Sequence, residues 1–241
     1  ILCKSKTDQD DWSTSGTMEI GKYDPTKDKV EMEQIYDGVT KHHAMFVARN
    51  KEGFDDLYFG GTEGVFRATC KDGEWNVEHL LSVPTSDIVY MDLDGDGVVE
   101  IPVQEPFPGY AADASEQVRL TRWLSVSGEQ LTEKERGYFS LNDGCVFLLP
   151  LSWYDTVTAV NDTLTGDIVF CRYDGEINDH MTELLRYSVA QDTESQEERE
   201  TEGYRLLHTR GKASYYMKPA ETDDSLAQPW QELMVRFSFV Q

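Results

Sequence analysis

The sequence predicts a mainly β protein, in which propeller-blade-like antiparallel β repeats over residues 1–137 precede a smaller α+β domain over residues 138–241. Three observations lead to this fold class: many short strand-like runs between Gly, Asp and Asn turns, a repeat in the first half, and one amphipathic helical pattern near the C-terminus. A chain of 241 residues also has a natural length for two compact units.

Strand-like runs rich in β-branched and aromatic residues fill the first half of the chain, and nothing before residue 112 has a helical pattern. The Asp-Gly pair at residues 72–73 is typical of a tight hairpin turn between two of these runs. The runs are GTMEIGKYD, KVEMEQIYD, AMFVARN, DLYFGGTEGVFRATC, GEWNVEHLL, DIVYMDLD and VVEIPV.

Two of these segments form a repeat. VARNKEGFDDLYFGG aligns with YMDLDGDGVVEIPVQ at an offset of 44 residues, which places Gly53 on Gly97 and Asp56 on Glu100. This period is typical of four-stranded propeller blades, but a closed propeller takes four or more of them. We therefore expect an open, partly wrapped arrangement, or a preceding segment that completes it.

The second half has a different pattern. We place the domain boundary before Tyr138, after the charged run GEQLTEKERG, and expect strands in CVFLLPLSW, DIVFCRYDG, ELLRYSVAQ, GYRLLHTRG and SYYMKP. The acidic insert at residues 191–203 has no apolar face, so it is expected to be a mobile, dispensable loop. The positions i, i+3, i+4 and i+7 of an amphipathic helix are taken by Trp230, Leu233, Met234 and Phe237.

The composition limits the classes of partner. The chain has 22 Lys and Arg against 45 Asp and Glu, a formal net charge of −23, which repels nucleic acid and anionic membrane surfaces. No run of 18 apolar residues exists, so a transmembrane segment is not expected. The acidity instead favours cations and basic or neutral partners, and it suits an exported protein.

The cysteines and the N-terminus give weaker indications. No C-x-x-C pair occurs, so zinc and thioredoxin-type chemistry are not expected. The cysteines are predicted to be buried thiols, with a Cys145–Cys171 disulfide as the alternative. Residues 1–3 lack the context of a lipidated cysteine and are predicted to form a strand, so a signal or anchor segment would precede them.

The segment from Tyr90 to Val103 carries the clearest chemical pattern. Asp92, Asp94 and Asp96 stand at positions 1, 3 and 5 of a glycine-rich loop, Val98 at position 7 offers a backbone carbonyl, and Glu100 at position 9 closes it. Ca²⁺ takes six to eight oxygen ligands from loops of this kind. The pattern predicts a structural Ca²⁺ site formed by these five residues.

Two other structures, an EF-hand and a plain hairpin turn, fit this segment less well. An EF-hand needs a glutamate at position 12, where this chain has Val103. A plain hairpin turn needs only one or two of the four carboxylates, which repel one another without a cation. The equivalent loop of the first repeat has Ala48 at position 1 and keeps Asn50, Glu52 and Asp56, so it is expected to be an empty or weak site.

The segment DLDGDGVVEI resembles the calcium loop of FG-GAP/VCBS-type repeats, which occur in integrin-like propellers and in secreted bacterial surface proteins. The segments GYFSLNDGCVFLLPLSW and GYRLLHTRGKASYYMKP resemble exported proteins of Gram-positive anaerobes. These resemblances imply a calcium-binding protein that is extracellular or anchored at the cell surface.

No catalytic motif of a hydrolase, metalloprotease or nucleotide-binding enzyme occurs in the sequence. His42 and His43 are adjacent and would point to opposite faces of a strand, so they are not expected to share a metal. The favoured function is a non-enzymatic exported or cell-surface protein that presents a β-repeat surface to a glycan or protein. The alternative is a carbohydrate-active enzyme, or an ancillary module of one, with the calcium structural.

Overall fold

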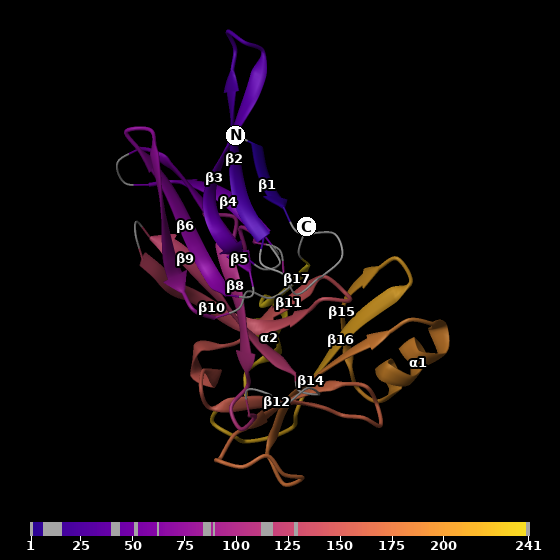
Figure 1. Cartoon of the computed structure of the whole chain (residues 1–241). Helices are drawn as coiled ribbons and strands as arrows, with labels where there is room; N and C mark the ends of the chain where they lie inside the picture. Colours follow the sequence, from indigo (N-terminus) through magenta and orange to yellow (C-terminus); the bar gives the residue numbers. More distant parts are fainter. Residues whose placement is uncertain are drawn as a thin grey trace. The chain divides into compact units, whose positions relative to one another are not determined.

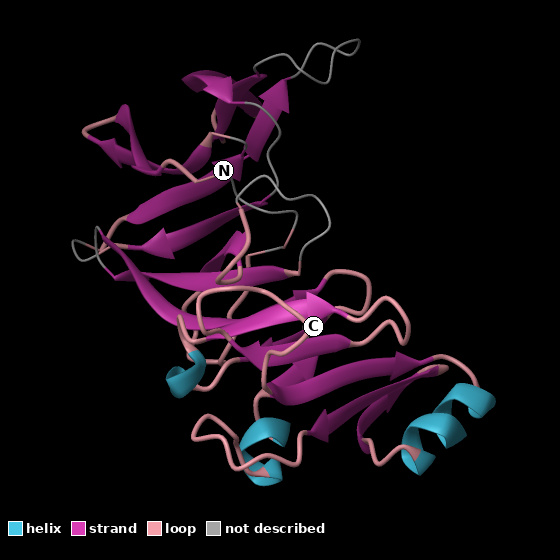
Figure 2. Ribbon diagram, turned by 90° about the horizontal axis from the view of Figure 1, so that it is seen from below, coloured by secondary structure: helices cyan, strands magenta, loops and turns pink. Residues whose placement is uncertain are grey.

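The computed structural model describes residues 2–6, 16–39, 44–50, 53–61, 63–83, 88, 90–111, 118–127 and 130–239. The chain divides into two compact units, each built from two segments: residues 1–104 with 122–134, and residues 105–121 with 135–241. Antiparallel strands dominate both units (Figures 1 and 2), which confirms the mainly β prediction. None of the helices in the described ranges is long and apolar enough to cross a membrane.

Unit 1 contains two complete sheets and the beginning of a third. The first sheet has the order β1-β2-β3 and the second the order β4-β5-β6-β7. The strands are β1 (Leu2–Lys6), β2 (Gly16–Asp24), β3 (Lys29–Val39), β4 (Ala44–Arg49), β5 (Asp55–Gly61), β6 (Gly64–Lys71) and β7 (Glu74–Leu81).

The second sheet has the form of a propeller blade, because its four antiparallel strands follow one another in chain order. Both of its faces are covered. One face packs with β2 in a cluster that includes Met18, Leu57 and Phe66, and the other contributes Val65 to a cluster with Ile101 of β8. Blade-like sheets therefore stack through their apolar faces, but no closed barrel or propeller is found among the described strands.

Three strands contribute residues to both units, in a sheet of order β17-β11-β10-β9-β8. Unit 2 also holds a complete sheet of order β12-β13-β14-β16-β15. The strands are β8 (Glu100–Pro106), β9 (Arg119–Ser127), β10 (Gln130–Ser140), β11 (Cys145–Leu148), β12 (Val157–Asn161), β13 (Ile168–Arg172), β14 (Glu183–Ala190), β15 (Arg205–Arg210), β16 (Ala213–Pro219) and β17 (Phe237–Phe239).

The core of unit 2 lies between its two sheets and is rich in aromatic side chains. Phe147 of β11 and Phe170 of β13 have ring centroids 5.3 Å apart, and the fully buried Trp153 lies 5.9 Å from Phe170. The Trp153 indole also donates a hydrogen bond of 2.7 Å to the carbonyl of Leu226. This bond satisfies the one polar group that the buried indole brings into the core.

The acidic insert is not the loop that the sequence predicts. It forms α1 (Thr193–Thr201), which begins with a capping box between Asp192 and Ser195 and buries no residue. The prediction of a loop was wrong because it relied on the missing apolar face, whereas a short helix can be held by its cap and by polar contacts.

Two other segments differ from expectation. The charged run before Tyr138 belongs to β10, so the predicted boundary after residue 137 falls inside a strand. The predicted C-terminal helix is confined to α2 (Trp230–Met234), and Phe237 opens β17, which pairs with β11. The last residue of the predicted helical pattern, Phe237, therefore belongs to a strand instead of the helix.

The cysteines of the described side chains are free thiols, as the buried-thiol interpretation expects. The alternative disulfide is not formed: Cys145 lies in β11, with its Sγ 3.1 Å from the Tyr187 hydroxyl, whereas Cys171 lies in β13. Burial raises the pKa of Cys145 to about 12 and that of Cys171 to about 11. Both thiols therefore stay protonated at neutral pH.

Two hairpin glycines of unit 1 provide a matched test of the fold. A Cβ on Gly64 would lie 1.8 Å from the Leu81 carbonyl oxygen, whereas one on Gly73 would meet nothing within 4 Å, and both residues have a positive φ. We expect Gly73→Ala to cost about 1–2 kcal/mol from backbone strain alone. Gly64→Ala should cost at least ~3 kcal/mol, because backbone must move as well. Urea unfolding of the two variants measures the difference, and equal losses would contradict the β6–β7 pairing.

Candidate functional site: the carboxylate loop before β8

The segment with the predicted metal ligands is a loop whose two ends are joined by backbone hydrogen bonds. Met91 and Glu100 exchange N–H···O bonds of 3.2 and 2.7 Å in an antiparallel bridge. Beyond this bridge the chain enters β8, where Ile101 and Val103 are buried. The loop is therefore anchored at the point where a core strand begins.

Asp92 organises the loop from within. Its Oδ1 accepts hydrogen bonds from the backbone N–H groups of Gly95 and Asp96, at 2.7 and 3.1 Å. Its Oδ2 accepts one from Gly97 at 2.8 Å. Gly97 has a φ of +85°, a conformation that costs a glycine little. These contacts wrap the chain around a single carboxylate.

Three of the predicted ligands converge. Asp92, Asp94 and Glu100 each offer one carboxylate oxygen, and these oxygens lie within 4.8 Å of one another. Glu100 is fully buried, and its Oε2 accepts a 2.8 Å hydrogen bond from the Leu93 N–H. Hard carboxylate oxygens in one small volume are a donor set that fits Ca²⁺.

The other two predicted ligands have different contacts. Asp96 accepts a 2.8 Å hydrogen bond from the Val98 N–H through its Oδ1, and its Oδ2 contacts Lys134. Val98 precedes β8, and its side chain is partly exposed. The converging carboxylates are therefore three of the four that the sequence predicts as ligands.

A lysine that the sequence analysis missed lies among these carboxylates. The Nζ of Lys134, from β10, is 3.0 Å from Asp94 Oδ1, 2.6 Å from Asp96 Oδ2 and 3.1 Å from Glu100 Oε1. Only the pairing of β8, β9 and β10 brings Lys134 to the loop, because it lies 34 residues beyond Glu100 in the chain. The charged run around Lys134 was the one signal in the sequence.

The electrostatics agree with this contact. Burial opposes a charge on Lys134, but hydrogen bonds to Asp96, Asp94 and Glu100 outweigh it and raise the pKa of Lys134. The hydrogen bond from Lys134 also lowers the pKa of Asp96, with help from the Val98 N–H. One ammonium group lies among four carboxyl groups, so the formal charge of the loop is negative. An excess of carboxylates of this kind could hold a metal ion.

The equivalent loop of the first repeat is closed by hydrogen bonds of Asn50 in its described part, and Glu52 lies outside the described residues. The Asn50 side chain donates a 3.0 Å hydrogen bond to Asp56, and its Oδ1 accepts one of 3.0 Å from the Phe54 N–H. Gly53 has the same φ of +85° as Gly97, and Asp56 is buried like Glu100. The two hairpin loops are thus related, but a neutral amide takes the place of the Lys134 ammonium.

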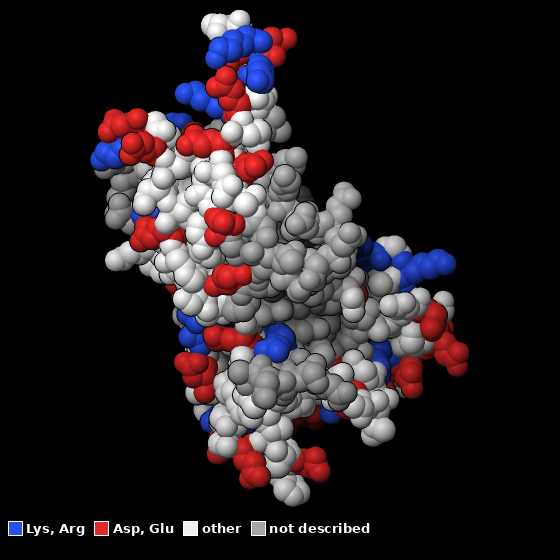
Figure 3. All heavy atoms as spheres, in the orientation of Figure 1, with Lys and Arg blue, Asp and Glu red and all other residues white. Residues whose placement is uncertain are grey.

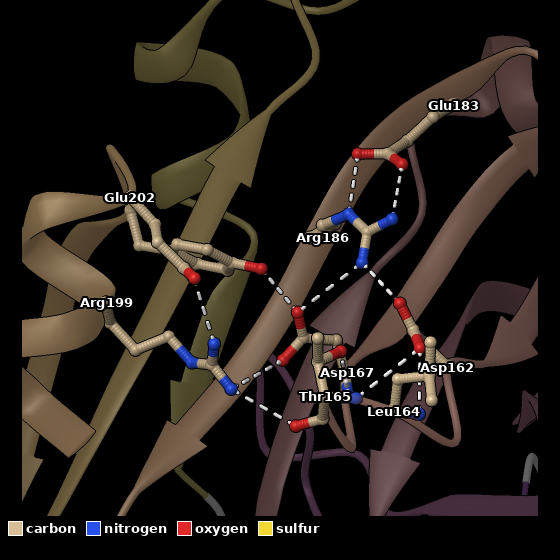
Figure 4. A network of polar contacts seen from close by, with 9 residues as sticks. Asp162, Leu164, Thr165, Asp167, Glu183, Arg186, Arg199 and Glu202 are labelled. Atoms are coloured by element: carbon tan, nitrogen blue, oxygen red, sulfur yellow. Dashed lines mark hydrogen bonds and ion pairs between the residues drawn. The ribbon is translucent and has the colours of Figure 1, made fainter.

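Unit 2 contains a second charged cluster, shown in Figure 4. The fully buried Asp167 accepts a hydrogen bond from the Tyr204 hydroxyl and lies 3.7 Å from Arg186 and 3.4 Å from Arg199. Arg186 also binds Glu183 through two hydrogen bonds of 2.9 and 2.8 Å. Its guanidinium and that of Arg199 both have carboxylate partners, as is typical of a structural charge cluster.

The same cluster explains why the acidic insert is ordered. Arg199 of α1 is 3.4 Å from Asp167, donates to the Thr165 carbonyl at 3.1 Å and pairs with Glu202 at 3.1 Å. The α1 helix thus supplies one of the cations beside a buried carboxylate, and whether the segment is dispensable stays a prediction that deletion would test.

The histidines do not form a site in the described part of the chain. His79 contacts the Glu63 carbonyl at 3.0 Å and stacks on Phe66, and His208 packs beside Phe239. His42 and His43 lie outside the described residues.

Comparisons with protein-family models, with curated proteins and with solved structures find no match to this chain. No family is assigned, and the resemblance to FG-GAP/VCBS repeats stays a prediction.

Lys134→Met tests the role of the internal cation. Without Ca²⁺ the variant should lose about 1–2 kcal/mol of stability, because the carboxylates keep no cation. Millimolar Ca²⁺ should then raise its melting temperature by more than that of the wild type, since the competing ammonium group is gone. Lys27→Met is the control, because Lys27 also contacts two carboxylates, Asp24 and Glu31, but at an exposed hairpin. A Ca²⁺ response equal to that of the wild type would contradict the competition.

Arg199→Met tests the anchoring of α1. The variant leaves Asp167 with one cation fewer, so we expect a loss of about 2–4 kcal/mol in unfolding free energy. Hydrogen exchange over residues 193–201 should also become faster. The control is Glu197→Gln, an exposed change on the same helix. Unchanged exchange in the Arg199 variant would show that the capping box alone holds α1.

Proposed function

We propose that the protein is a non-enzymatic, exported or cell-surface protein in which the carboxylate loop is a structural Ca²⁺ site. Its stacked blade-like sheets would present their connecting loops to a glycan or protein partner. The observation that carries the proposal is the convergence of Asp92, Asp94 and Glu100 at the start of a buried strand. An ion at this position would fix the geometry of β8 and the loop together.

The location and charge of the loop support a structural role. Asp92 already binds three backbone N–H groups, so the loop is shaped for a fixed geometry. Bound Ca²⁺ would supply the positive charge that allows the remaining carboxylates to stay close. It would also release Lys134 from these carboxylates, because both cations would use Asp94 and Glu100.

The cell exterior suits a site of this kind. Calcium sites of extracellular modules have dissociation constants of roughly 10⁻⁴–10⁻³ M. A loop with an internal competing cation should bind Ca²⁺ weakly and would need such concentrations to fill. The net charge of −23 also favours solubility outside the cell.

Calcium binding is tested by thermal unfolding of metal-free protein with added CaCl₂ or with chelator. Saturation at 100 times the dissociation constant should stabilise the fold by about 2.7 kcal/mol. Asp94→Ala should abolish this stabilisation, whereas Asp72→Ala, a change at another hairpin turn, should keep it. Identical melts with and without Ca²⁺ would overturn the calcium site.

The same protein serves to test the alternative function. A screen of glycan and ester substrates with calcium-loaded protein should give no turnover. Turnover that disappears in Asp92→Ala, while the fold persists, would favour the carbohydrate-active enzyme instead.

A further inference from the structure

An apolar groove of about 230 Å³ lies within unit 2, between the two strands that form the edges of its sheets. Strand β15 forms one wall, β17 the opposite wall, and α2 closes one end. The lining includes Leu207 and His208 from β15, Trp230 and Met234 from α2, and Phe237 and Phe239 from β17.

A β-bulge in β15 places its basic side chains on the face that borders this groove. The pairing of β15 with β16 shifts between Leu206 and His208, so Leu207 has no partner of its own. Without the bulge, residues five positions apart would face opposite sides of the sheet. Because of it, three side chains share the face of their partners Met217, Tyr215 and Ala213. They are Arg205, His208 and Arg210.

The partners on β16 show that this shared face looks toward the groove. Met217 and Tyr215 belong to the core cluster of unit 2, which also packs against Trp230, Phe237 and Phe239. The guanidinium of Arg205 lies 5.3 Å from the Trp230 ring centroid, and that of Arg210 lies 5.2 Å from the Phe239 ring centroid. Each end of the groove therefore carries one arginine.

These two arginines differ from most others in the chain. Neither Arg205 nor Arg210 has an ion pair within the described ranges, although acidic residues outnumber basic ones by 45 to 22. The nearby Asp143 accepts a hydrogen bond from Ser140. Figure 3 shows Lys and Arg atoms at the end of the β15–β16 hairpin. The arginines with carboxylate partners are Arg49, Arg67, Arg122, Arg136, Arg172, Arg186 and Arg199.

We propose that this groove binds an extended acidic peptide that places a large apolar side chain between two carboxylates. On β16 the partners of Arg205 and Arg210 are Met217 and Ala213, four residues apart, a span of about 13 Å in a strand. An extended peptide covers this span between residues i and i+4, and its residue i+2 points the same way. The matching pattern is therefore a carboxylate, an apolar anchor at i+2 and a second carboxylate at i+4.

The bulge also indicates how such a peptide is held. A bulge and charged side chains on an edge strand disfavour the addition of another strand. Recognition therefore depends on the side chains: the anchor enters the groove, and each guanidinium gives a carboxylate two parallel hydrogen bonds. The site is independent of the carboxylate loop, which lies in unit 1.

The probe is a fluorescein-labelled peptide, Gly-Gly-Glu-Ser-Phe-Ser-Glu-Gly-Gly, titrated with the full chain by fluorescence polarisation. Two control peptides isolate the features: one has Lys in place of both Glu residues, and one has Ser in place of Phe. We expect the acidic Phe peptide to bind at least about tenfold more tightly than either control. Its affinity should fall as NaCl is raised.

Variants of the chain assign the binding to this groove. Arg205→Gln and Arg210→Gln should each weaken binding by about five- to tenfold, since each removes one charged hydrogen-bond donor. Lys212→Gln removes the same charge at the adjacent turn and should leave the affinity unchanged. Equal affinity for the acidic and Lys peptides, equal losses in all three variants, or no saturation at millimolar protein would each overturn the proposal.

Discussion

The burial of the Glu100 carboxylate is the constraint on which the centre of unit 1 depends. A carboxyl group with no exposed surface needs hydrogen-bond partners, and a cation nearby lowers the cost of burying it, because an unpaired buried charge costs several kcal/mol. The Leu93 N–H comes from the loop and Lys134 comes from β10. The Lys134 contact forms only when β8, β9 and β10 pair in the observed order. One buried charge thus links the loop conformation to the order of strands in the sheet.

Unit 2 meets the same constraint with different residues. Asp167 is fully buried at the start of β13, and its partners come from β14, from α1 and from the segment before β15. Breaking such a cluster is costly, whereas the intact cluster adds little net stability over an apolar core. Its effect is on specificity: α1 has no buried apolar residue, and the cluster determines where it docks.

The sequence predicts those features that depend on local spacing. Alternating apolar residues identify β2, short apolar runs between turns identify β5 and β6, and alternate aspartates identify the loop at Asp92. It does not reveal Lys134, because the contact joins residues that are distant in the chain and no local pattern marks a lysine as an internal cation. The position of α1 is also not predictable from local spacing, because its Arg199 contacts Asp167, which is distant in the chain. The charged run around Lys134 led to a predicted domain boundary there, although it forms one charged face of the strand β10.

The difference between Lys134 and a divalent ion lies in charge and in availability. Lys134 is tethered to β10 and is present at every ion concentration, but it compensates one of four charges. Calcium would compensate two, yet only where its concentration approaches a weak dissociation constant. A loop with both options would fold before calcium arrives and would become more rigid after it. In the first repeat the described contact to the buried Asp56 comes from the neutral Asn50 amide instead of from an ammonium group.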